Sequence, residues 1–326
     1  MRLVFVVNSS ASSVTERTRV VIAKALAADH DVTVAETSRR GHATKLAQGA
    51  AADGADAVVV LGGDGTINEA ANGLAGTSTA LGVLPGGSTN VFARTLGFTN
   101  DPVEATGELL AALDARSWRR VGLGAVNGRA FTFHVGIGYD AAVVAQVERR
   151  GSLKRYAGHA LFVGAAVDTW LRGYDRRRRA FTVEARTADG SVTRDDGVFG
   201  ISLRTNPYTF LGERPLDVAP GAGLDTALTL VTLQRLELVT LLPLAAAALR
   251  GRGLDGRRGV AVRRQVVAAT YRATRPLPYQ VDGDHLGEAD HFAVAFEPDA
   301  LTLVVPDVRS GGPRRRLPPA LGRPAR

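Results

Sequence analysis

The stretch Ala57-Val58-Val59-Val60-Leu61-Gly62-Gly63-Asp64-Gly65-Thr66 (residues 57–66) decides the fold of the N-terminal part. Its first five residues form a continuous apolar run, which is typical of a central strand in a parallel sheet. The glycines that follow allow a tight turn and a close approach of the backbone to a ligand. The stretch therefore predicts a buried strand, a turn and a helix that begins next to the turn.

The residues on both sides of this stretch continue the alternation of strand and helix. The expected elements are strands at 2–8, 31–36, 57–61 and 80–84 and helices at about 13–28 and 43–52. Ser13 and Glu16 have capping-box spacing at the start of the first helix. A second glycine-rich turn, residues 84–90, follows a strand and opens another helix. This rhythm predicts a parallel sheet with helices on its faces.

The pattern changes near residue 118, where hairpin signals replace the alternation. Asn127-Gly128 and Ala188-Asp189-Gly190 are turn sequences between strand-like runs. Strands are expected at 121–126, 129–137, 181–186, from 191 onward, 227–233, 260–271, 291–296 and 301–305, and helices at 139–149 and 236–250. The predicted fold is an α/β N-terminal nucleotide-binding domain, with a parallel sheet and flanking helices, plus a mainly antiparallel β-sandwich C-terminal domain.

Length and composition agree with two packed domains. The chain has 326 residues, of which 45% are hydrophobic and 22% charged. The predicted division is 1–118 for the first domain, 119–309 for the second and 310–326 for a disordered basic tail. The sequence holds no cysteine, which excludes disulfides and thiolate chemistry. No apolar run approaches about 20 residues, so we expect a cytoplasmic protein without a membrane span.

The net charge of +8 favours anionic partners. The segment 153–179 combines Lys and Arg with aromatic residues, which suits peripheral contact with an anionic membrane surface. An equally simple interpretation is a solvated helix end. Nothing in the sequence matches a nucleic-acid-binding module, so we expect no nucleic-acid partner. A homodimer is left open.

The two glycine-rich turns, 61–69 and 84–90, follow strands of the same predicted sheet. Open α/β sheets bind ligands at the carboxyl edge of their strands, and free amides at helix starts bind anions. The pair of turns therefore fits a nucleotide polyphosphate. Asp64 is a poor neighbour for phosphate unless a cation such as Mg²⁺ lies between them. For one turn alone, a structural cap would be the simpler interpretation of Asp64.

Five segments together resemble one known family. They are residues 62–66, 68–74, 85–94, 136–141 (Gly-Ile-Gly-Tyr-Asp-Ala) and 281–284 (Val-Asp-Gly-Asp). In this order they are similar to the signature of diacylglycerol and sphingosine kinases, over about residues 1–306. The resemblance implies an α/β nucleotide domain and a β-sandwich domain, with the active site in the cleft between them.

The resemblance also implies a set of nucleotide-binding residues. It places Asn8 beside the nucleotide and makes Asp64 the residue that holds Mg²⁺–ATP. It suggests Glu69 for a ribose hydroxyl, for which a solvated carboxylate is the alternative, and Arg94 for phosphate charge or support of the turn. The phosphate cradle and the second wall would consist of Gly62, Gly63, Gly65, Thr66, Gly86, Gly87, Ser88 and Asn90.

Phosphoryl transfer needs a residue that orients the attacking hydroxyl. The candidate catalytic carboxylates are Asp282 first, Asp284 second and Asp64, with Asp140 facing the lipid head group or capping a helix. Asp-Gly between two strand-like runs is also an ordinary hairpin turn. We expect domain closure to bring Asp282 to the substrate.

The function that follows is an ATP-dependent lipid kinase that transfers the γ-phosphate to a lipid hydroxyl, with diacylglycerol as the first choice and phosphatidic acid as its product. The alternatives are a kinase for sphingoid bases or other lipid alcohols, a NAD kinase-like enzyme and an inactive lipid-binding protein. Two departures bear on this choice. Related bacterial kinases often carry Asp where this chain has Val91 and Gly122, so the metal must be held differently here.

Overall fold

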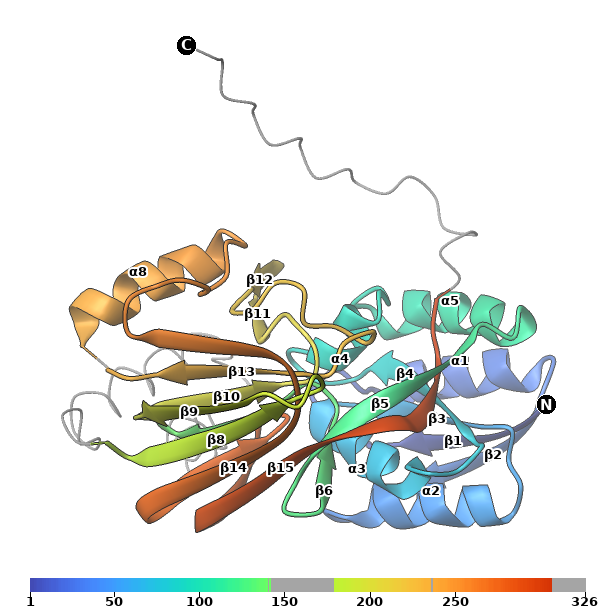
Figure 1. The fold of residues 1–326 in the computed structure, drawn as a ribbon. Helices are drawn as coiled ribbons and strands as arrows, with labels where there is room; N and C mark the ends of the chain where they lie inside the picture. The colour runs from blue at the N-terminus through green and yellow to red at the C-terminus, as the bar shows by residue number, and fades with distance from the viewer. Residues whose placement is uncertain (140, 142–178, 236, 307–326) are drawn as a thin grey trace.

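The structure is a computed structural model that describes residues 1–139, 141, 179–235 and 237–306 (Figure 1). Asp140, nearly all of the predicted helix at 139–149, the basic segment up to residue 178 and the tail from residue 307 lie outside the described residues. Arg179, the last residue of that basic segment, is described and pairs with Asp196 at 2.9 Å.

The N-terminal half is a parallel sheet covered by helices on both faces. Its strands are β1 (Arg2–Val7), β2 (Asp31–Glu36), β3 (Ala57–Gly62) and β4 (Ala80–Pro85), in the order β4-β3-β1-β2. Its helices are α1 (Glu16–Ala27), α2 (His42–Ala52), α3 (Asp64–Leu74), α4 (Val91–Thr95) and α5 (Pro102–Asp114). Helices α2 and α3 cover one face, and α1 and α5 the other (Figure 1).

Burial explains why the central strands read as continuous apolar runs. Every residue of β3 and β4 is buried, because helices cover both faces of the sheet. The predicted start of the first helix was wrong. Thr15 caps α1 by accepting a hydrogen bond from the Thr18 amide, whereas the Ser13 hydroxyl donates to the carbonyl of Gly87 at 3.0 Å.

The C-terminal half is built from antiparallel strands. They are β5 (Trp118–Val126), β6 (Arg129–Phe131), β7 (His134–Gly138), β8 (Phe181–Thr187), β9 (Val192–Gly197), β10 (Phe199–Leu203), β13 (Leu228–Leu233), β14 (Val260–Val281) and β15 (Asp284–Val304). A small hairpin, β11 (Thr209–Leu211) and β12 (Arg214–Leu216), and the helix α8 (Leu238–Leu249) complete it. The predicted hairpins at Asn127-Gly128 and at 188–190 are confirmed by the β5–β6 and β8–β9 pairs.

The last strand joins the two halves. The runs expected at 291–296 and 301–305 belong to one strand, β15, whose pairing with β5 shifts between Glu297 and Leu301. Beyond this shift, Thr302 and Leu303 pair in parallel with β4, so the strands form one continuous mixed sheet. The predicted fold class is confirmed, but β15 crosses the division expected at residue 118.

Among the residues that the structure describes, three clusters of buried side chains make up the core. The largest surrounds the parallel sheet and includes Leu301 and Leu303 of β15. A second lies among the antiparallel strands around Tyr271 and Phe292. In the third, Leu244 and neighbouring alanines of α8 pack against β10 and β13. Within the described ranges, no helix is long and apolar enough to cross a membrane.

Candidate active site

The two glycine-rich turns lie side by side at the carboxyl edge of the parallel sheet. Strands β3 and β4 are neighbours, with Gly62 opposite Pro85. A Cβ atom added to Gly87 would lie 2.8 Å from the Cα of Gly63, and one added to Gly86 would lie 2.8 Å from the amide nitrogen of Gly62. Glycine is therefore required for the two turns to pack against each other.

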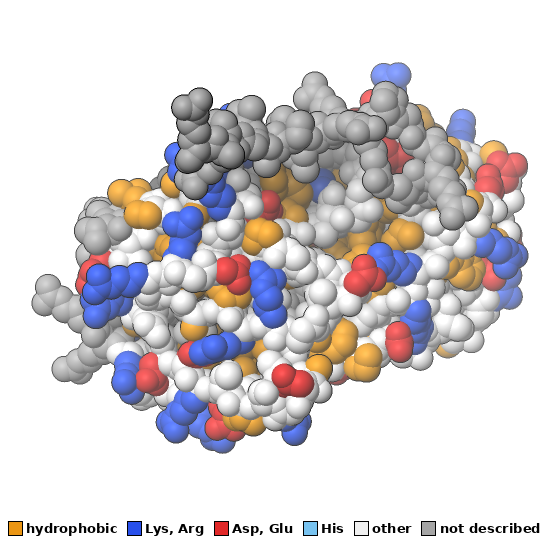
Figure 2. Space-filling view, turned by 45° about the horizontal axis from the view of Figure 1, so that its top comes forward, with side chains coloured by type: hydrophobic (Ala, Val, Ile, Leu, Met, Phe, Trp, Pro, Cys, Tyr) orange, Lys and Arg blue, Asp and Glu red, His pale blue; other side chains and the backbone are white. Residues whose placement is uncertain are grey.

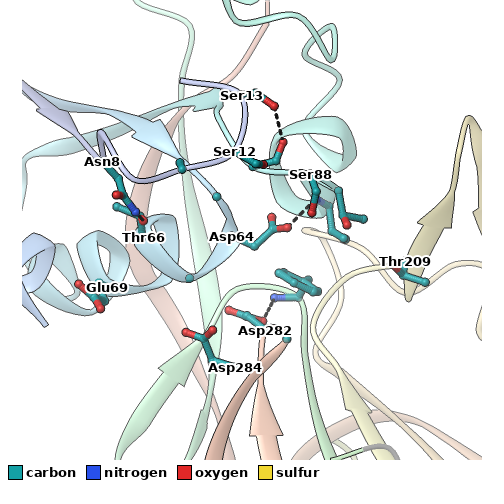
Figure 3. A pocket seen from close by; sticks show the side chains of 18 of the residues that line it. Asn8, Ser12, Ser13, Asp64, Thr66, Glu69, Ser88, Thr209, Asp282 and Asp284 are labelled. Atoms are coloured by element: carbon teal, nitrogen blue, oxygen red, sulfur yellow. Dashed lines mark hydrogen bonds between the residues drawn. The ribbon is translucent and has the colours of Figure 1, made fainter. Parts of the chain in front are cut away.

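A cavity of about 1000 Å³ opens at these turns and is lined by both halves of the chain (Figure 3). The predicted site residues that line it are Asn8, Gly63, Asp64, Gly65, Thr66, Glu69, Gly87, Ser88, Asp282 and Asp284. The fold thus brings together residues that are more than 200 positions apart in the sequence.

Asp64 stands at the first position of α3 and also caps α4. Its two carboxylate oxygens accept hydrogen bonds from the backbone amides of Val91 and Phe92, both at 3.0 Å. Burial raises the pKa of Asp64 to about 6, and the charges of Asp282 and Asp284 act in the same direction, whereas the two backbone hydrogen bonds lower the pKa. Each oxygen uses one lone pair on these bonds and keeps another for a further ligand.

Asn8 and Thr66 connect the first turn to the loop after β1. The amide of Asn8 donates a hydrogen bond to the Thr66 hydroxyl at 2.9 Å, and its oxygen accepts one from the Ser10 amide at 3.1 Å. These bonds bring the loop of residues 10–13 to the wall of the cavity. The pair therefore shapes the cavity wall beside the first glycine-rich turn.

Glu69 is buried, and its carboxylate already has two backbone partners. It accepts hydrogen bonds from the amides of Gly41 at 2.7 Å and Ala43 at 3.2 Å, at the start of α2. This contact supplies the capping carboxylate that the N-terminus of α2 itself lacks. The contact between Glu69 and a ribose hydroxyl stays a prediction.

Three of the predicted binding residues lie behind the cavity wall rather than on it. They are Gly62, Gly86 and Asn90. The side chain of Asn90 is buried, accepts from the Gly87 amide at 2.7 Å and donates to the Gly87 carbonyl at 3.0 Å. Asn90 thus fixes the conformation of the second turn from within.

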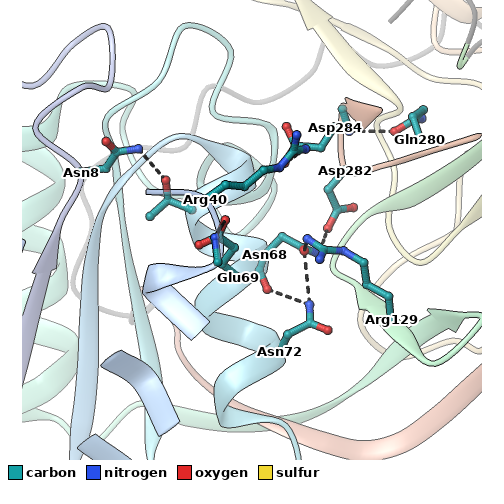
Figure 4. Close-up of polar contacts among 12 residues, drawn as sticks. Asn8, Arg40, Asn68, Glu69, Asn72, Arg129, Gln280, Asp282 and Asp284 are labelled. Atoms are coloured by element: carbon teal, nitrogen blue, oxygen red, sulfur yellow. Dashed lines mark hydrogen bonds and ion pairs between the residues drawn. The ribbon is translucent and has the colours of Figure 1, made fainter. Parts of the chain in front are cut away.

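Asp282 is a buried acceptor for five hydrogen bonds. Its carboxylate accepts from the amides of Thr132, Phe133 and His134, from the Thr132 hydroxyl and from the Asn68 side chain, at 2.7–3.0 Å. Burial raises its pKa, against these hydrogen bonds. Because Asn68 belongs to α3, Asp282 already joins the two halves (Figure 4), and the expected domain closure is not needed to bring it to the site.

Asp284 differs from Asp282 in exposure and partners. Its side chain is 27% exposed and pairs with Arg40 at 3.2 Å (Figure 4). A Cβ atom added to Gly65 would lie 2.7 Å from Asp284 Oδ2, so this carboxylate rests directly on the first glycine-rich turn. Of the two late aspartates, Asp284 is therefore the one that faces the cavity with a free surface.

Sequence reasoning missed several parts of the wall. Arg39 and Arg40 follow β2, and their position after a parallel strand was the signal that could have found them. On the opposite side, the ring of His134 lies 4.5 Å from that of Tyr208. Burial lowers the pKa of His134 to about 3, so this imidazole is neutral. The loop 208–211 and Gln280 complete that side.

Arg94 contacts the β11–β12 hairpin rather than the phosphate turn. Its guanidinium lies 3.6 Å from the ring centroid of Phe210, donates to the carbonyl of Gly212 at 3.0 Å and pairs with Glu213 at 3.3 Å. Because Asp64 caps α4, which carries Arg94, this contact connects the first glycine-rich turn to the hairpin that lines the far side of the cavity.

The residues that line the cavity supply only part of what a nucleotide with a magnesium ion would need. Among the described residues, no cluster of three or more His, Asp or Glu side chains could hold a metal ion. Mg²⁺ is usually bound by one or two carboxylates together with substrate phosphates and water. Asp64 could supply such a carboxylate beside a phosphate cradle of backbone amides.

Comparison with known proteins finds that this chain is similar to proteins named as lipid kinases. Residues 2–126 match the family model for the diacylglycerol kinase catalytic domain. The chain is 29% identical to a Pseudomonas aeruginosa protein named "Probable lipid kinase YegS-like", over 93% of each chain. It is 28% identical to the diacylglycerol kinase of Bacillus subtilis, over 72% of this chain and 74% of that one.

Solved structures share the fold. A diacylglycerol kinase structure from Bacillus anthracis superposes with a TM-score of 0.66 at 21% identity, covering 93% of this chain and 96% of that one. At this identity the likeness shows the fold alone. The order of parallel and antiparallel parts described above is thus common to both proteins.

Proposed function

Because residues 2–126 match the family model for the diacylglycerol kinase catalytic domain, we propose that this protein is a lipid kinase that transfers the γ-phosphate of ATP to the hydroxyl of diacylglycerol. The kinase activity itself is supported by the kinases among the relatives. The choice of diacylglycerol is the finer part of the proposal, and a sphingoid base or another lipid alcohol is the alternative within the same chemistry.

One observation carries the proposal. A carboxylate of the C-terminal half, Asp284, rests on the glycine-rich turn that is suited to phosphates, at Gly65. A hydroxyl placed beside Asp284 would therefore stand next to a bound terminal phosphate. In this arrangement Asp284 orients the hydroxyl and accepts its proton, while amides of the two turns bind the phosphates.

The residues divide into two groups by their contacts. Asp64 would hold Mg²⁺, directly or through water, and the ion when bound neutralises phosphate charge. Arg40 pairs with Asp284 and orients its carboxylate. Phe133, His134 and Tyr208 would contact the lipid on the opposite side of the cavity. Their apolar and uncharged surface suits the glycerol and acyl part of a lipid better than a second nucleotide.

The test is a direct assay with labelled ATP, Mg²⁺ and a panel of acceptors. The panel contains diacylglycerol, monoacylglycerol, a sphingoid base and NAD. We expect phosphate to be transferred to diacylglycerol in preference to the other acceptors. Transfer to NAD alone would contradict the lipid assignment, and transfer to a sphingoid base alone would correct the lipid while keeping the chemistry. No transfer to any acceptor would favour the inactive lipid-binding protein.

We also propose that the protein works in the cytoplasm and contacts an anionic membrane surface peripherally. The net charge of +8 and the membrane location of the substrate support this part. It is tested by sedimentation with vesicles that differ in their content of anionic lipid. Binding that is indifferent to that content and to salt would contradict it.

A further inference from the structure

Helix α8 has an apolar face that the described chain leaves exposed. Its twelve residues, Leu238–Leu249, include no charged side chain. Leu242 is 65% exposed and Leu249 is 41% exposed, and Ala245 between them is exposed as well. Positions 242, 245 and 249 follow the spacing of one helix face. This set of three residues is called the α8 face below.

The other face of α8 is fully used in the core. Leu244, Ala247 and Ala248 are buried against β10 and β13. The helix is therefore fixed to the sheet by one side and presents the α8 face on the other. Single exposed leucines are common on protein surfaces, but leucines that share one uncharged helix face form an apolar patch of the kind found at interaction sites.

Exposed arginines stand at both ends of the α8 face. Arg235 precedes the helix, and Arg250, Arg252 and Arg258 follow it. The structure records no ion pair between these four arginines and a described carboxylate. Three carboxylates lie near the helix. They are Glu237 at the helix start, Asp217, which would lie 3.4 Å from a Cβ atom added to Gly251, and Asp255, which pairs with Arg264 at 2.8 Å, so four arginines face three carboxylates. The surroundings of the α8 face are thus positive.

Backbone and side-chain hydrogen bonds connect α8 to the wall of the active-site cavity. The amide of Asp217 donates to the Ala248 carbonyl at 3.0 Å, and the Asp217 carboxylate accepts from the Asn206 side chain at 2.9 Å. Two residues after Asn206 comes Tyr208, which lines the cavity and donates its amide to Leu216 of β12 at 3.1 Å. In Figure 1, α8 and the β11–β12 hairpin lie along the same edge of the C-terminal half.

We propose that α8 is a membrane-docking helix, which lies flat on an anionic bilayer and inserts the α8 face among the lipids. An apolar helix face flanked by arginines is the pattern of an interfacial helix. Figure 2 shows hydrophobic side chains with Lys and Arg among them at the end of the molecule where α8 lies. The inference rests on the proposed function in one respect: the membrane holds the lipid substrate, and docking places the hairpin and cavity at its surface.

The first experiment measures binding to vesicles, which requires no turnover. The full chain is sedimented with vesicles of phosphatidylcholine alone or with phosphatidylglycerol added. The double variant Leu242→Glu/Leu249→Glu should lower the bound-to-free ratio on anionic vesicles by about tenfold or more. The matched control is Val103→Glu, an exposed valine (47%) in the first turn of α5, which should bind like the wild type. Equal binding of the double variant and wild type would overturn the proposal.

The second experiment tests the charge. Arg250→Gln/Arg252→Gln should reduce the preference for phosphatidylglycerol vesicles, with Arg17→Gln on the exposed surface of α1 as the control. If the variant keeps the full preference for anionic vesicles, the arginines next to α8 have no part in docking. If wild-type binding is the same on neutral and anionic vesicles, the anionic bilayer is the wrong partner.

A third measurement remains informative if the glutamate variants fail to fold. Leu242→Trp keeps the face apolar, and its fluorescence should shift to shorter wavelength when vesicles are added, beyond any shift of the wild-type protein. Absence of this extra shift would contradict insertion. Sedimentation velocity tests for a second copy of the chain: a dimer that Leu242→Glu dissociates, with vesicle binding unchanged, would assign α8 to a subunit interface instead.

The final comparison separates this inference from the proposed function. A short-chain diacylglycerol that dissolves as monomers bypasses the membrane. The double variant should phosphorylate this substrate like the wild type and lose activity only on substrate embedded in vesicles. If the wild type phosphorylates neither form, the proposed function fails, and the vesicle-binding results still decide the role of α8.

Discussion

Asp282 accepts hydrogen bonds from three backbone amides and two side chains, whereas Asp284 pairs with the exposed Arg40 and faces the cavity. The sequence-based prediction placed Asp282 before Asp284. A motif does not show how many hydrogen-bond donors surround a carboxylate in the fold, so this order could not be checked from the sequence. Both oxygens of Asp282 are occupied by donors, which leaves little capacity to take a proton from a substrate. We therefore propose Asp284 as the catalytic residue and Asp282 as a positioning residue.

This division predicts different outcomes for two conservative variants. Asp284→Asn should lower kcat by about 100-fold or more with ATP affinity and melting temperature nearly unchanged, because a general base is lost. Asp282→Asn should reduce the free energy of unfolding by about 2–4 kcal/mol, because an amide group would face backbone N–H donors. Steady-state kinetics and thermal unfolding measure both. A fully active Asp284→Asn enzyme would rule out the assignment.

Asp64 should make the affinity for Mg²⁺–ATP depend on pH. Its pKa is raised to about 6, so the carboxylate is neutral below this pH and charged above it. Only the charged form attracts Mg²⁺, so the affinity for Mg²⁺–ATP should rise as the pH increases from 5 to 7, with a midpoint near 6. The variant Asp64→Asn has no carboxylate to titrate at this position. ATP itself titrates equally in both measurements, so its contribution cancels in the ratio of wild-type to variant affinity. A ratio independent of pH would contradict the assignment.

At the level of elements, the β11–β12 hairpin is held by a contact between Phe210 and Arg94 that no local sequence pattern predicts. Phe210 and Arg94 are 116 positions apart in the sequence. The sequence suggested only that Arg94 lies on the helix after the second glycine-rich turn, and not which residue it contacts. The side chain stacks on Phe210 and holds the Gly212 carbonyl, so it fixes the hairpin over α4. The hairpin in turn forms the side of the cavity wall that is proposed to contact the lipid.

Arg94→Ala should therefore impair the lipid side more than the nucleotide side. Loss of the stacking contact and the hydrogen bond should raise the KM for the lipid by about tenfold and leave the KM for ATP nearly constant. Arg94→Lys keeps the charge but loses the planar stacking, so it should lie between the two. An increase in the KM for ATP alone would show instead that Arg94 acts on the phosphates.

Local elements were the part of the fold that the sequence could predict. The apolar run at 57–61 and the turn at Asn127-Gly128 have physical signals within a few residues, and both are confirmed. The long reach of β15 was not predictable in this way. Its first part also pairs with β14 and its last residues with β4, while β5 pairs with both parts. The runs 291–296 and 301–305 are separated by Glu297-Pro298-Asp299, which resembles a turn between two strands.

At the scale of the whole molecule, Arg204 joins distant segments from inside. It is 1% exposed and donates to the carbonyls of Gly122, Gly223, Leu224 and Thr226 at 2.7–3.0 Å. Burial lowers its pKa to about 10, which leaves it charged at neutral pH. Arg204→Met should therefore reduce the free energy of unfolding by about 3–5 kcal/mol, because several buried carbonyls lose their donor. A chemical denaturation curve that matches the wild type would contradict this role.

The position of Arg204 also bears on the missing carboxylates. The resemblance to bacterial lipid kinases implies an aspartate at Gly122, but a Cβ atom there would lie 2.5 Å from the ring of Phe296, and its carbonyl is bound by Arg204. At Val91 the side chain is buried and apolar. The Arg204 guanidinium therefore stands at Gly122, and neither Val91 nor Gly122 has a side chain that could bind a metal ion.

This arrangement predicts that chelation separates turnover from stability. Removal of divalent ions with EDTA should abolish phosphoryl transfer, because Asp64 and the phosphates need the ion, and should leave the melting temperature of the nucleotide-free protein unchanged. Added Mg²⁺ should raise the melting temperature of the protein only when ATP is also present, because the phosphates supply most of the ligands of the ion. A melting temperature that falls on chelation without nucleotide would reveal a structural metal ion and contradict this prediction.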